Sequence, residues 1–134
     1  MKKFVLFSVL ALFVNIQAVE TAHIYLCRKC HITVKKTGLP NTAYCQAQGN
    51  HNWSDLGVCG ENIYHCRKCR KIVRTANRPI VIYCPSQGNH IWDFLAKIGK
   101  NQYLCRKCNI KIPARNTPSV IYCPAGGNHN WSKF

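Results

Sequence analysis

Three copies of one cysteine and histidine pattern limit the possible folds of this chain more than any other feature. Each copy reads Cys-x2-Cys-x14-Cys-x5-His-x-Trp, and the first cysteines of the copies, Cys27, Cys66 and Cys105, stand 39 residues apart. Equal spacing at this length indicates one supersecondary unit repeated in tandem. The sequence therefore predicts three repeats, at residues 23–57, 62–96 and 101–134.

Each repeat carries the ligands of a tetrahedral zinc site. Three thiols and one imidazole are the number and type of ligands that a closed structural site uses. A module of about 35 residues buries too little apolar surface to offset the entropy of its chain, so it needs a metal or disulfides. We therefore expect three zinc ions. The predicted ligands are Cys27, Cys30, Cys45 and His51; Cys66, Cys69, Cys84 and His90; and Cys105, Cys108, Cys123 and His129.

The same cysteines allow a second interpretation, a disulfide scaffold. The chain contains ten cysteines, an even number, and secreted proteins normally pair their thiols. Three cysteines cannot all pair within one repeat, however, and the recurring histidine would then have only a packing role. Cys59 has no equivalent in the other repeats and is expected to be a free or intermolecular thiol. The sequence alone leaves zinc and disulfides, complete or mixed, both open.

The first eighteen residues resemble a secretory signal. Lys2 and Lys3 precede a largely apolar run at residues 4–14, and Ala18 offers a small residue before a cut at Val19. The run is shorter than the roughly 20 residues of a membrane-spanning helix. We expect residues 1–18 to be a signal peptide and the protein to be secreted; the alternative is an uncleaved anchor.

Short β-branched segments predict the secondary structure of each repeat. A first run follows the second cysteine, at residues 32–34, 72–73 and 110–112, and a second run precedes the third cysteine, at residues 80–83 and 120–122. Gly49, Gly88 and Gly127 can supply the positive φ of a turn beside the histidine. We expect small β-rich, zinc-ribbon-like modules in three tandem repeats, with few or no helices after the signal peptide.

The connections between the repeats differ in composition. Residues 91–98 have the only helix-like composition, which predicts a short helix between repeats 2 and 3. Residues 56–62 include two glycines and predict a flexible linker between repeats 1 and 2. Few contacts between repeats can be predicted, so we expect them to move independently.

Other recurring residues have structural explanations. Trp53, Trp92 and Trp131 are expected to cover the metal sites and to form the small core of each repeat. Three histidines, His23, His31 and His65, do not recur at equivalent positions, and we expect them to face solvent.

The chain is strongly basic. Nineteen lysines and arginines against four acids give a formal charge of +15, and removal of residues 1–18 takes away two lysines and no acid, which leaves +13. One Zn²⁺ with three thiolates carries −1, so three sites would leave most of the excess. A strongly basic surface attracts anionic polymers or anionic membranes. The predicted anion-binding residues lie in or beside the Cys-Arg-Lys-Cys turns: Arg28, Lys29, Arg67, Lys68, Arg70, Lys71, Arg106 and Lys107.

The repeats resemble a small zinc-ribbon-like module of short bacterial proteins that end in Cys-Pro-x-Gly-Gly-x-His-x-Trp. Residues 123–131, Cys-Pro-Ala-Gly-Gly-Asn-His-Asn-Trp, carry the best match. The resemblance covers nearly all of each repeat and implies metal binding and a ribbon-like fold, but no activity. His31, Arg70 and Asn109 stand where such turns usually have Gly, and Gln46 replaces Pro in the first repeat, so the geometry of these turns is not implied.

Charge and the predicted signal favour a secreted, cationic, zinc-stabilised protein that binds anionic polymers or bacterial surfaces. Linkage of three basic repeats would add avidity, and a host-defence, antimicrobial role would suit it. Nucleic acid is a second candidate partner, and we expect no small-molecule substrate. The alternative is an extracellular structural or metal-sequestering protein with disulfide-linked repeats.

We do not expect an enzyme. Cys-Arg-Lys-Cys could serve a thiol-disulfide oxidoreductase, because basic neighbours lower the pKa of a thiol. No βαβ scaffold surrounds this motif, however, and the third cysteine and the histidine recur without a catalytic partner. No acid recurs in all three repeats, so general acid-base catalysis repeated three times is not expected.

Overall fold

The structure is a computed structural model, and it describes residues 20–134. These residues form eight strands and no helix, which confirms the predicted β-rich class. The predicted signal peptide, residues 1–18, lies outside the described residues. No helix in the described part of the chain has the length and apolar character needed to cross a membrane.

Each repeat consists of one hairpin and one further strand. The turn of the hairpin carries the first two cysteines, and the strand after the histidine pairs with the first arm of the hairpin. The pairing register is shared, with Trp53 opposite Cys27, Trp92 opposite Cys66 and Trp131 opposite Cys105. The strands are β1 (His23–Cys27), β2 (Thr33–Lys36), β3 (Trp53–Cys66), β4 (Ile72–Thr75), β5 (Trp92–Lys97), β6 (Asn101–Cys105), β7 (Lys111–Ala114) and β8 (Trp131–Lys133).

The first predicted β-branched run of each repeat is found in β2, β4 and β7. The second run, residues 80–83 and 120–122, was wrongly predicted to be strand. It is an irregular loop in which Tyr83 and Tyr122 have φ of 63° and 57°, a left-handed conformation that a strand does not use. The Ile80 carbonyl, at the start of the loop in repeat 2, instead accepts a 3.1 Å hydrogen bond from Trp92 Nε1.

Strand β3 replaces the predicted flexible linker between repeats 1 and 2. Its 14 residues pair with β1 through residues 53–58 and with β4 and β5 through residues 62–66. Five strands therefore form one sheet shared by two repeats, while β7, β6 and β8 form a separate sheet in repeat 3. Gly60 is required here, because a Cβ at this position would overlap the backbone of Ala76.

Residues 91–98 are not the predicted helix. Trp92–Lys97 form β5, whose backbone pairs with β3, and Leu95 and Ala96 are buried. Helix propensity is a weak preference that packing overrides, and here the next core cluster requires these side chains on a strand.

The apolar core lies between the repeats rather than inside them. One cluster joins Ile24, Leu26 and Leu56 of repeat 1 to Val73 and Trp92 of repeat 2. A second cluster joins three residues of repeat 2 to three residues of repeat 3. Those of repeat 2 are Ile63, Leu95 and Ala96, and those of repeat 3 are Tyr103, Ile112 and Ala114. The repeats therefore pack against one another, and the expectation of independent repeats was wrong.

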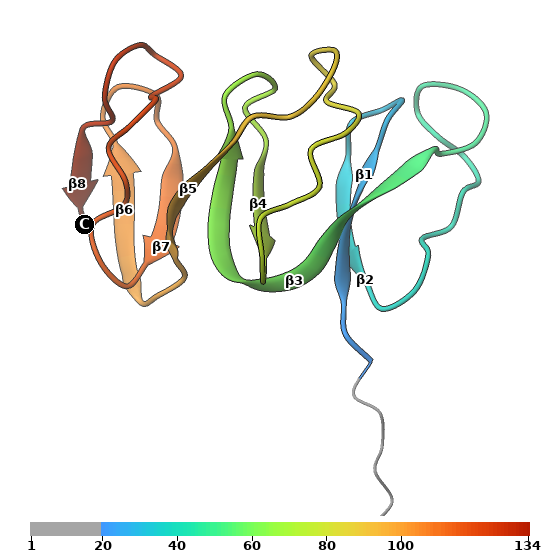
Figure 1. The fold of residues 1–134 in the computed structure, drawn as a ribbon, viewed down its shortest axis with the longest axis horizontal. Coiled ribbons are helices and arrows are strands. Elements are labelled where there is room, and N and C mark those ends of the chain that lie inside the picture. The colour runs from blue at the N-terminus through green and yellow to red at the C-terminus, as the bar shows by residue number, and fades with distance from the viewer. Residues whose placement is uncertain (1–19) are drawn as a thin grey trace, which may run out of the picture.

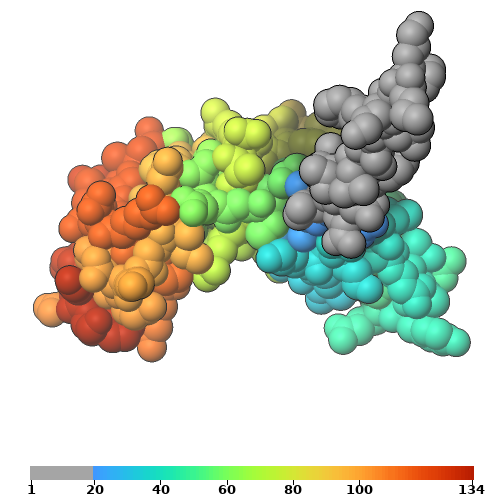
Figure 2. All heavy atoms as spheres, turned by 90° about the horizontal axis from the view of Figure 1, so that it is seen from below, coloured from blue at the N-terminus to red at the C-terminus, as the bar shows by residue number. Residues whose placement is uncertain are grey.

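The repeats form a row. Figure 1 shows repeat 1 (β1 and β2) at one end and repeat 3 (β6, β7 and β8) at the other, with the three hairpin turns that carry the cysteines along the same edge. Figure 2 shows the same order from below, from the orange and red residues of repeat 3 to the cyan residues of repeat 1. Because the units repeat in one direction, the first two cysteines of every repeat lie on this edge.

Candidate metal centres

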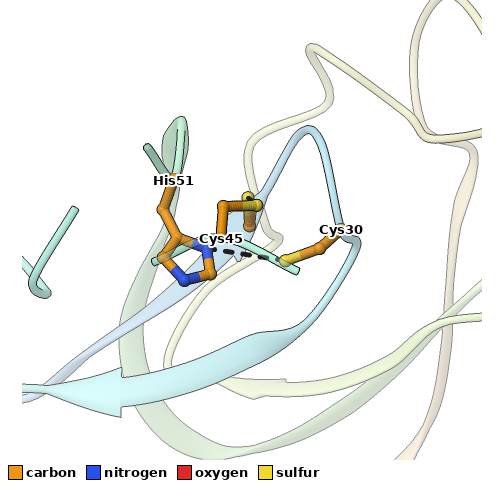
Figure 3. A group of neighbouring side chains, drawn as sticks. Cys30, Cys45 and His51 are labelled. Carbon is orange, nitrogen blue, oxygen red and sulfur yellow. Dashed lines mark hydrogen bonds between the residues drawn. The ribbon is translucent and has the colours of Figure 1, made fainter. Parts of the chain in front are cut away.

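The structure brings together all twelve predicted metal ligands, in three groups of four. In each group the sulfur and imidazole nitrogen atoms lie within 4.8 Å of one another. The first cysteine ends the first arm of the hairpin, the second lies in the turn, and the third cysteine and the histidine come from the loop before the next strand. Figure 3 shows the side chains of Cys30, Cys45 and His51 pointing toward one another.

The distances fit tetrahedral zinc and not disulfides. Two sulfurs that bind one zinc ion at about 2.3 Å lie about 3.8 Å apart, whereas a disulfide needs about 2.05 Å. The first and third cysteines of the groups have Sγ–Sγ distances of 3.9, 4.0 and 3.9 Å. The second cysteine lies 3.5 Å from the histidine Nδ1 in every group. All ten cysteines are free thiols in the described residues, so the chain has three zinc sites.

The pKa values of the thiols also indicate that each group of ligands binds a cation. Burial opposes ionisation of Cys27, but hydrogen bonds from the Cys30 backbone and from His51 outweigh it and lower the pKa to about 5. The second cysteine behaves in the opposite way, because burial and then the neighbouring thiols raise the pKa of Cys69 and Cys108 to about 12. One thiolate thus forms easily and the next does not until positive charge balances the first. A divalent ion supplies that charge.

The turns keep their shape without the glycine that the resemblance led us to expect. His31, Arg70 and Asn109 have φ of 61°, 60° and 60°, the left-handed conformation that Gly adopts most easily. Each backbone N–H donates to the carbonyl of the first cysteine, at 2.9, 2.9 and 2.8 Å. The hydrogen bond and the metal ligands hold a conformation that costs a non-glycine residue of order 1 kcal/mol.

The prediction that glycine supports the second turn is confirmed. Gly49, Gly88 and Gly127 have φ of 67°, 63° and 62°. Each carbonyl accepts a hydrogen bond from the backbone N–H of the third cysteine, at 2.8 to 2.9 Å. This bond fixes the third cysteine beside the histidine that follows six residues later.

The prediction that tryptophan covers the metal site is also confirmed, but the predicted small core within each repeat was wrong, because the apolar clusters lie between repeats and Trp53 belongs to neither. The rings of His51 and Trp53 stack with centroids 4.6 Å apart, and the equivalent pairs in repeats 2 and 3 stack at 4.5 and 4.7 Å. Each indole N–H donates to a carbonyl in the loop before the third cysteine, at 2.8 to 3.1 Å. The tryptophan thus ties the ligating imidazole to that loop.

The three unrepeated histidines have different environments. His31 is exposed, and His23 is partly exposed and contacts Asp55 at 2.8 Å. His65 was wrongly expected to face solvent: it is fully buried, and neither ring nitrogen has a hydrogen-bond partner among the described residues. It occupies the position of Leu26 and Leu104 in the other repeats, a signal that the aligned repeats already contained.

The lysines of the three turns have a structural role that sequence reasoning missed. Lys29 Nζ donates to the carbonyls of Gln48 and Asn50 at 2.8 and 3.2 Å, and Lys107 makes the equivalent contacts in repeat 3. Lys68 donates to the Gln87 carbonyl in repeat 2. These bonds connect the two loops that supply the ligands, and each ammonium group is exposed.

The arginines of the same turns differ from repeat to repeat. Arg28 Nε donates to Ser54 Oγ at 2.6 Å, whereas Arg67 makes two bonds to Asp93, at 2.7 and 2.8 Å. Arg106 has only a long contact of 3.4 Å to Ser132. Arg70, the next predicted anion-binding residue, is exposed, and Lys71 is partly buried.

Cys59 lies in β3, outside all three groups. Its side chain is partly buried and packs against the core cluster between repeats 1 and 2. Its place in the fold is therefore that of a small apolar residue.

Comparison with known protein families, curated proteins and solved structures gives no match.

Proposed function

We propose that this chain is a secreted, zinc-stabilised repeat protein that binds anionic polymers or bacterial surfaces through the edge that carries its metal centres. One observation carries the proposal: the three Cys-Arg-Lys-Cys turns lie along the same edge of the row (Figure 1). All eight predicted anion-binding residues belong to these turns or follow them directly. A row of cations matches the repeating charges of a polymer or the surface of an anionic membrane.

The acids of the chain do little to neutralise this edge. Asp93 pairs with Arg67, but Glu61 pairs with Arg115 and Asp55 with His23, both outside the turns. Three zinc centres subtract three charges from the formal +15. Of the lysines and arginines of the turns, Arg67 alone pairs with an acid among the described residues, so most of the positive charge of this edge is not neutralised by a carboxylate.

Exposed apolar residues beside the cations favour a membrane surface among the anionic partners. Residues Ile80, Val81 and Ile82 of repeat 2 are exposed, as are Val120 and Ile121 of repeat 3. Arg28 lines a hollow together with Ile82, and Arg67 lines the equivalent hollow with Ile121. Cations with apolar neighbours suit an anionic lipid headgroup region, and on bacteria such binding would serve host defence.

The zinc ions have a structural role in this proposal. Each group offers four protein ligands, which leaves no open coordination position for substrate or water. We accordingly propose no enzymatic activity. The alternative, an extracellular structural or metal-sequestering protein, predicts zinc binding without binding to anionic surfaces.

Two double variants test whether the edge binds. R70N/K71Q removes two charges from the edge, and Asn fits the left-handed turn because Asn109 has the same φ in repeat 3. K35Q/K36Q removes two charges at the far end of β2 and serves as the control. Binding to heparin and to anionic and neutral vesicles is measured over a range of salt concentrations.

We expect the edge variant to bind more weakly and to lose about one to two units of the salt slope, while the control changes little. Preference for vesicles over heparin would identify a membrane surface. Absence of binding at low ionic strength would refute the proposal, and equal effects of the two variants would refute the role of the edge. Secretion is tested separately, by sequencing the N-terminus of exported protein.

A further inference from the structure

The two ends of the row expose large apolar side chains, whereas such side chains are buried at the boundaries between repeats. The most exposed large apolar residues of the described chain are Tyr44, Leu39 and Phe134, at 94%, 73% and 66%. Tyr44 and Leu39 belong to repeat 1, and Phe134 belongs to repeat 3 at the opposite end (Figure 1). Exposed apolar side chains on the outer faces of repeats 1 and 3 are unusual, because a repeat face without a neighbour is normally polar.

Both boundaries inside the chain use the same aromatic contact. Arg28 of repeat 1 lies over the ring of Tyr83 in repeat 2, 3.2 Å from the centroid, and Arg67 of repeat 2 lies 3.0 Å from the centroid of Tyr122 in repeat 3. Tyr83 and Tyr122, which carry this contact, are 49% and 48% exposed, about half the exposed fraction of Tyr44. Tyr44 is their equivalent in repeat 1, and no arginine of the described residues lies over it.

A second contact also recurs at both boundaries. Leu56 and Leu95 are 1% and 2% exposed, and their carbonyls accept hydrogen bonds from the next repeat, from Ile80 N at 3.0 Å and from Ser119 N at 2.7 Å. The equivalent residue of repeat 3 is Phe134. Repeat 3 therefore offers a docking face made of Arg106, Leu104 and Phe134, the equivalents of residues that are engaged in repeats 1 and 2.

Repeat 1 offers the complementary face. Tyr44 is uncovered, and the backbone N–H of Asn41 stands where Ile80 and Ser119 donate to the preceding repeat. His51 and Trp53 are partly exposed, whereas their equivalents His90 and Trp92 are buried, and Trp92 packs against residues of repeat 1. The accepting surface of the internal boundaries is thus present on repeat 1 without its neighbour.

We propose that a second copy of this chain docks head to tail on the first, so that Arg106 of one copy lies over Tyr44 of the other and Phe134 takes the place of Leu56. The contact continues the boundary between repeats, and it buries Tyr44 and Phe134, two of the three most exposed large apolar residues among residues 20–134. An interface that joins two different faces leaves one of each free, so association continues to open chains unless the rotation closes a ring.

The contact between copies is weaker than the boundary inside the chain. Gln102 stands where Ile24 and Ile63 contribute to the core clusters, and the effective concentration that a covalent connection gives is absent. Both copies also carry a large positive charge, so they repel each other at low salt. Association should therefore increase with salt, which is the opposite of the salt effect on binding to a polyanion.

Two variants with one damaged face each test this proposal on the zinc-loaded chain. Y44N removes the accepting face, and Asn fits the left-handed backbone at this position. R106Q/F134A removes the docking face. Sedimentation velocity over a hundredfold range of concentration measures the mass of each variant and of their mixture, and zinc analysis confirms that each remains folded.

We expect the unchanged chain to form oligomers that increase with concentration and salt, and each variant alone to associate at least about tenfold more weakly. The mixture should form dimers and nothing larger, because only one intact pair of faces remains. A monomer at every concentration and salt would overturn the proposal. Association of either variant alone as strong as that of the unchanged chain, or a mixture that stays monomeric, would overturn it too, since these faces would then not be the ones that associate.

Discussion

Repeats 1 and 2 contain the same four ligands in the same register but differ in what covers their metal centres. His90 and Trp92 of repeat 2 are buried, with Trp92 packed against repeat 1, whereas His51 and Trp53 are partly exposed. The distances between the ligand atoms are nevertheless almost the same in both repeats. The ligands therefore set the local geometry, while the apolar burial that stabilises a repeat comes from its neighbour.

The largest effect should come from removing a ligand in the central repeat. Cys84→Ser should abolish the zinc site of repeat 2 and disturb both core clusters, whereas Cys45→Ser should abolish only the exposed site of repeat 1. A structural zinc ion contributes about 10 kcal/mol or more to folding. Zinc analysis should find about two ions per chain for C45S and fewer for C84S. Equal zinc contents would show that the repeats do not depend on their neighbours.

A smaller loss is expected from Gly60→Ala, at the boundary between repeats 1 and 2. The added Cβ would overlap the backbone of Ala76, and we expect a decrease of about 2–4 kcal/mol in the free energy of unfolding. Gly38→Ala in repeat 1 is the matched control, because a Cβ there meets no atom within 4 Å. Denaturant unfolding compares the two, and a neutral G60A would mean that β3 and the Ala76 turn separate at little cost.

The boundary between repeats 2 and 3 should become more stable when His65 is replaced by Leu, as at residue 26. Both ring nitrogens are buried without a hydrogen-bond partner in residues 20–134, so His65→Leu should raise the free energy of unfolding by about 1–2 kcal/mol. Burial, and then His129, lower the pKa of His65.

The gain from His65→Leu should depend on pH. The unfolded chain takes up a proton near pH 6.5, and the folded chain does so only at lower pH. The free energy of unfolding of the chain with a neutral His65 is therefore at its full value above about pH 6.5. It decreases as the pH falls toward and through the lowered pKa of His65 in the folded chain. Melting temperatures at pH 7.5 and pH 6 should differ less for H65L than for the unchanged chain. If H65L is less stable than the unchanged chain, the imidazole of His65 must have a polar partner in the folded protein.

The smallest effect concerns the arginines of the turns. Asp93→Ser gives repeat 2 the serine that Arg28 contacts in repeat 1, and it should lower the melting temperature slightly, because the exposed Arg67 loses a two-bond partner. The reverse change in repeat 1, Ser54→Asp, should raise the melting temperature by no more than D93S lowers it. A large loss in D93S, with zinc retained, would indicate that the buried carboxylate has a further role.

The metal centres could be predicted from the sequence, and the packing between repeats could not. Ligand identity is a local property, since two cysteines in one turn and a Cys-x5-His loop can satisfy zinc in only a few ways. Strand β5 depended on pairing with β3, a contact between distant residues, so composition suggested a helix instead. The glycines of residues 56–62 suggested flexibility, but Gly60 is needed because another chain segment approaches closely.

Strand β3 has a mechanical consequence. One continuous strand belongs to repeats 1 and 2. The two repeats therefore cannot be pulled away from each other without shearing the hydrogen bonds of the sheet that they share. Repeat 3 has its own three-stranded sheet and is joined through residues 98–100. Stretched between its ends, the molecule would yield in two unequal steps, with one repeat released as a unit and the other two together.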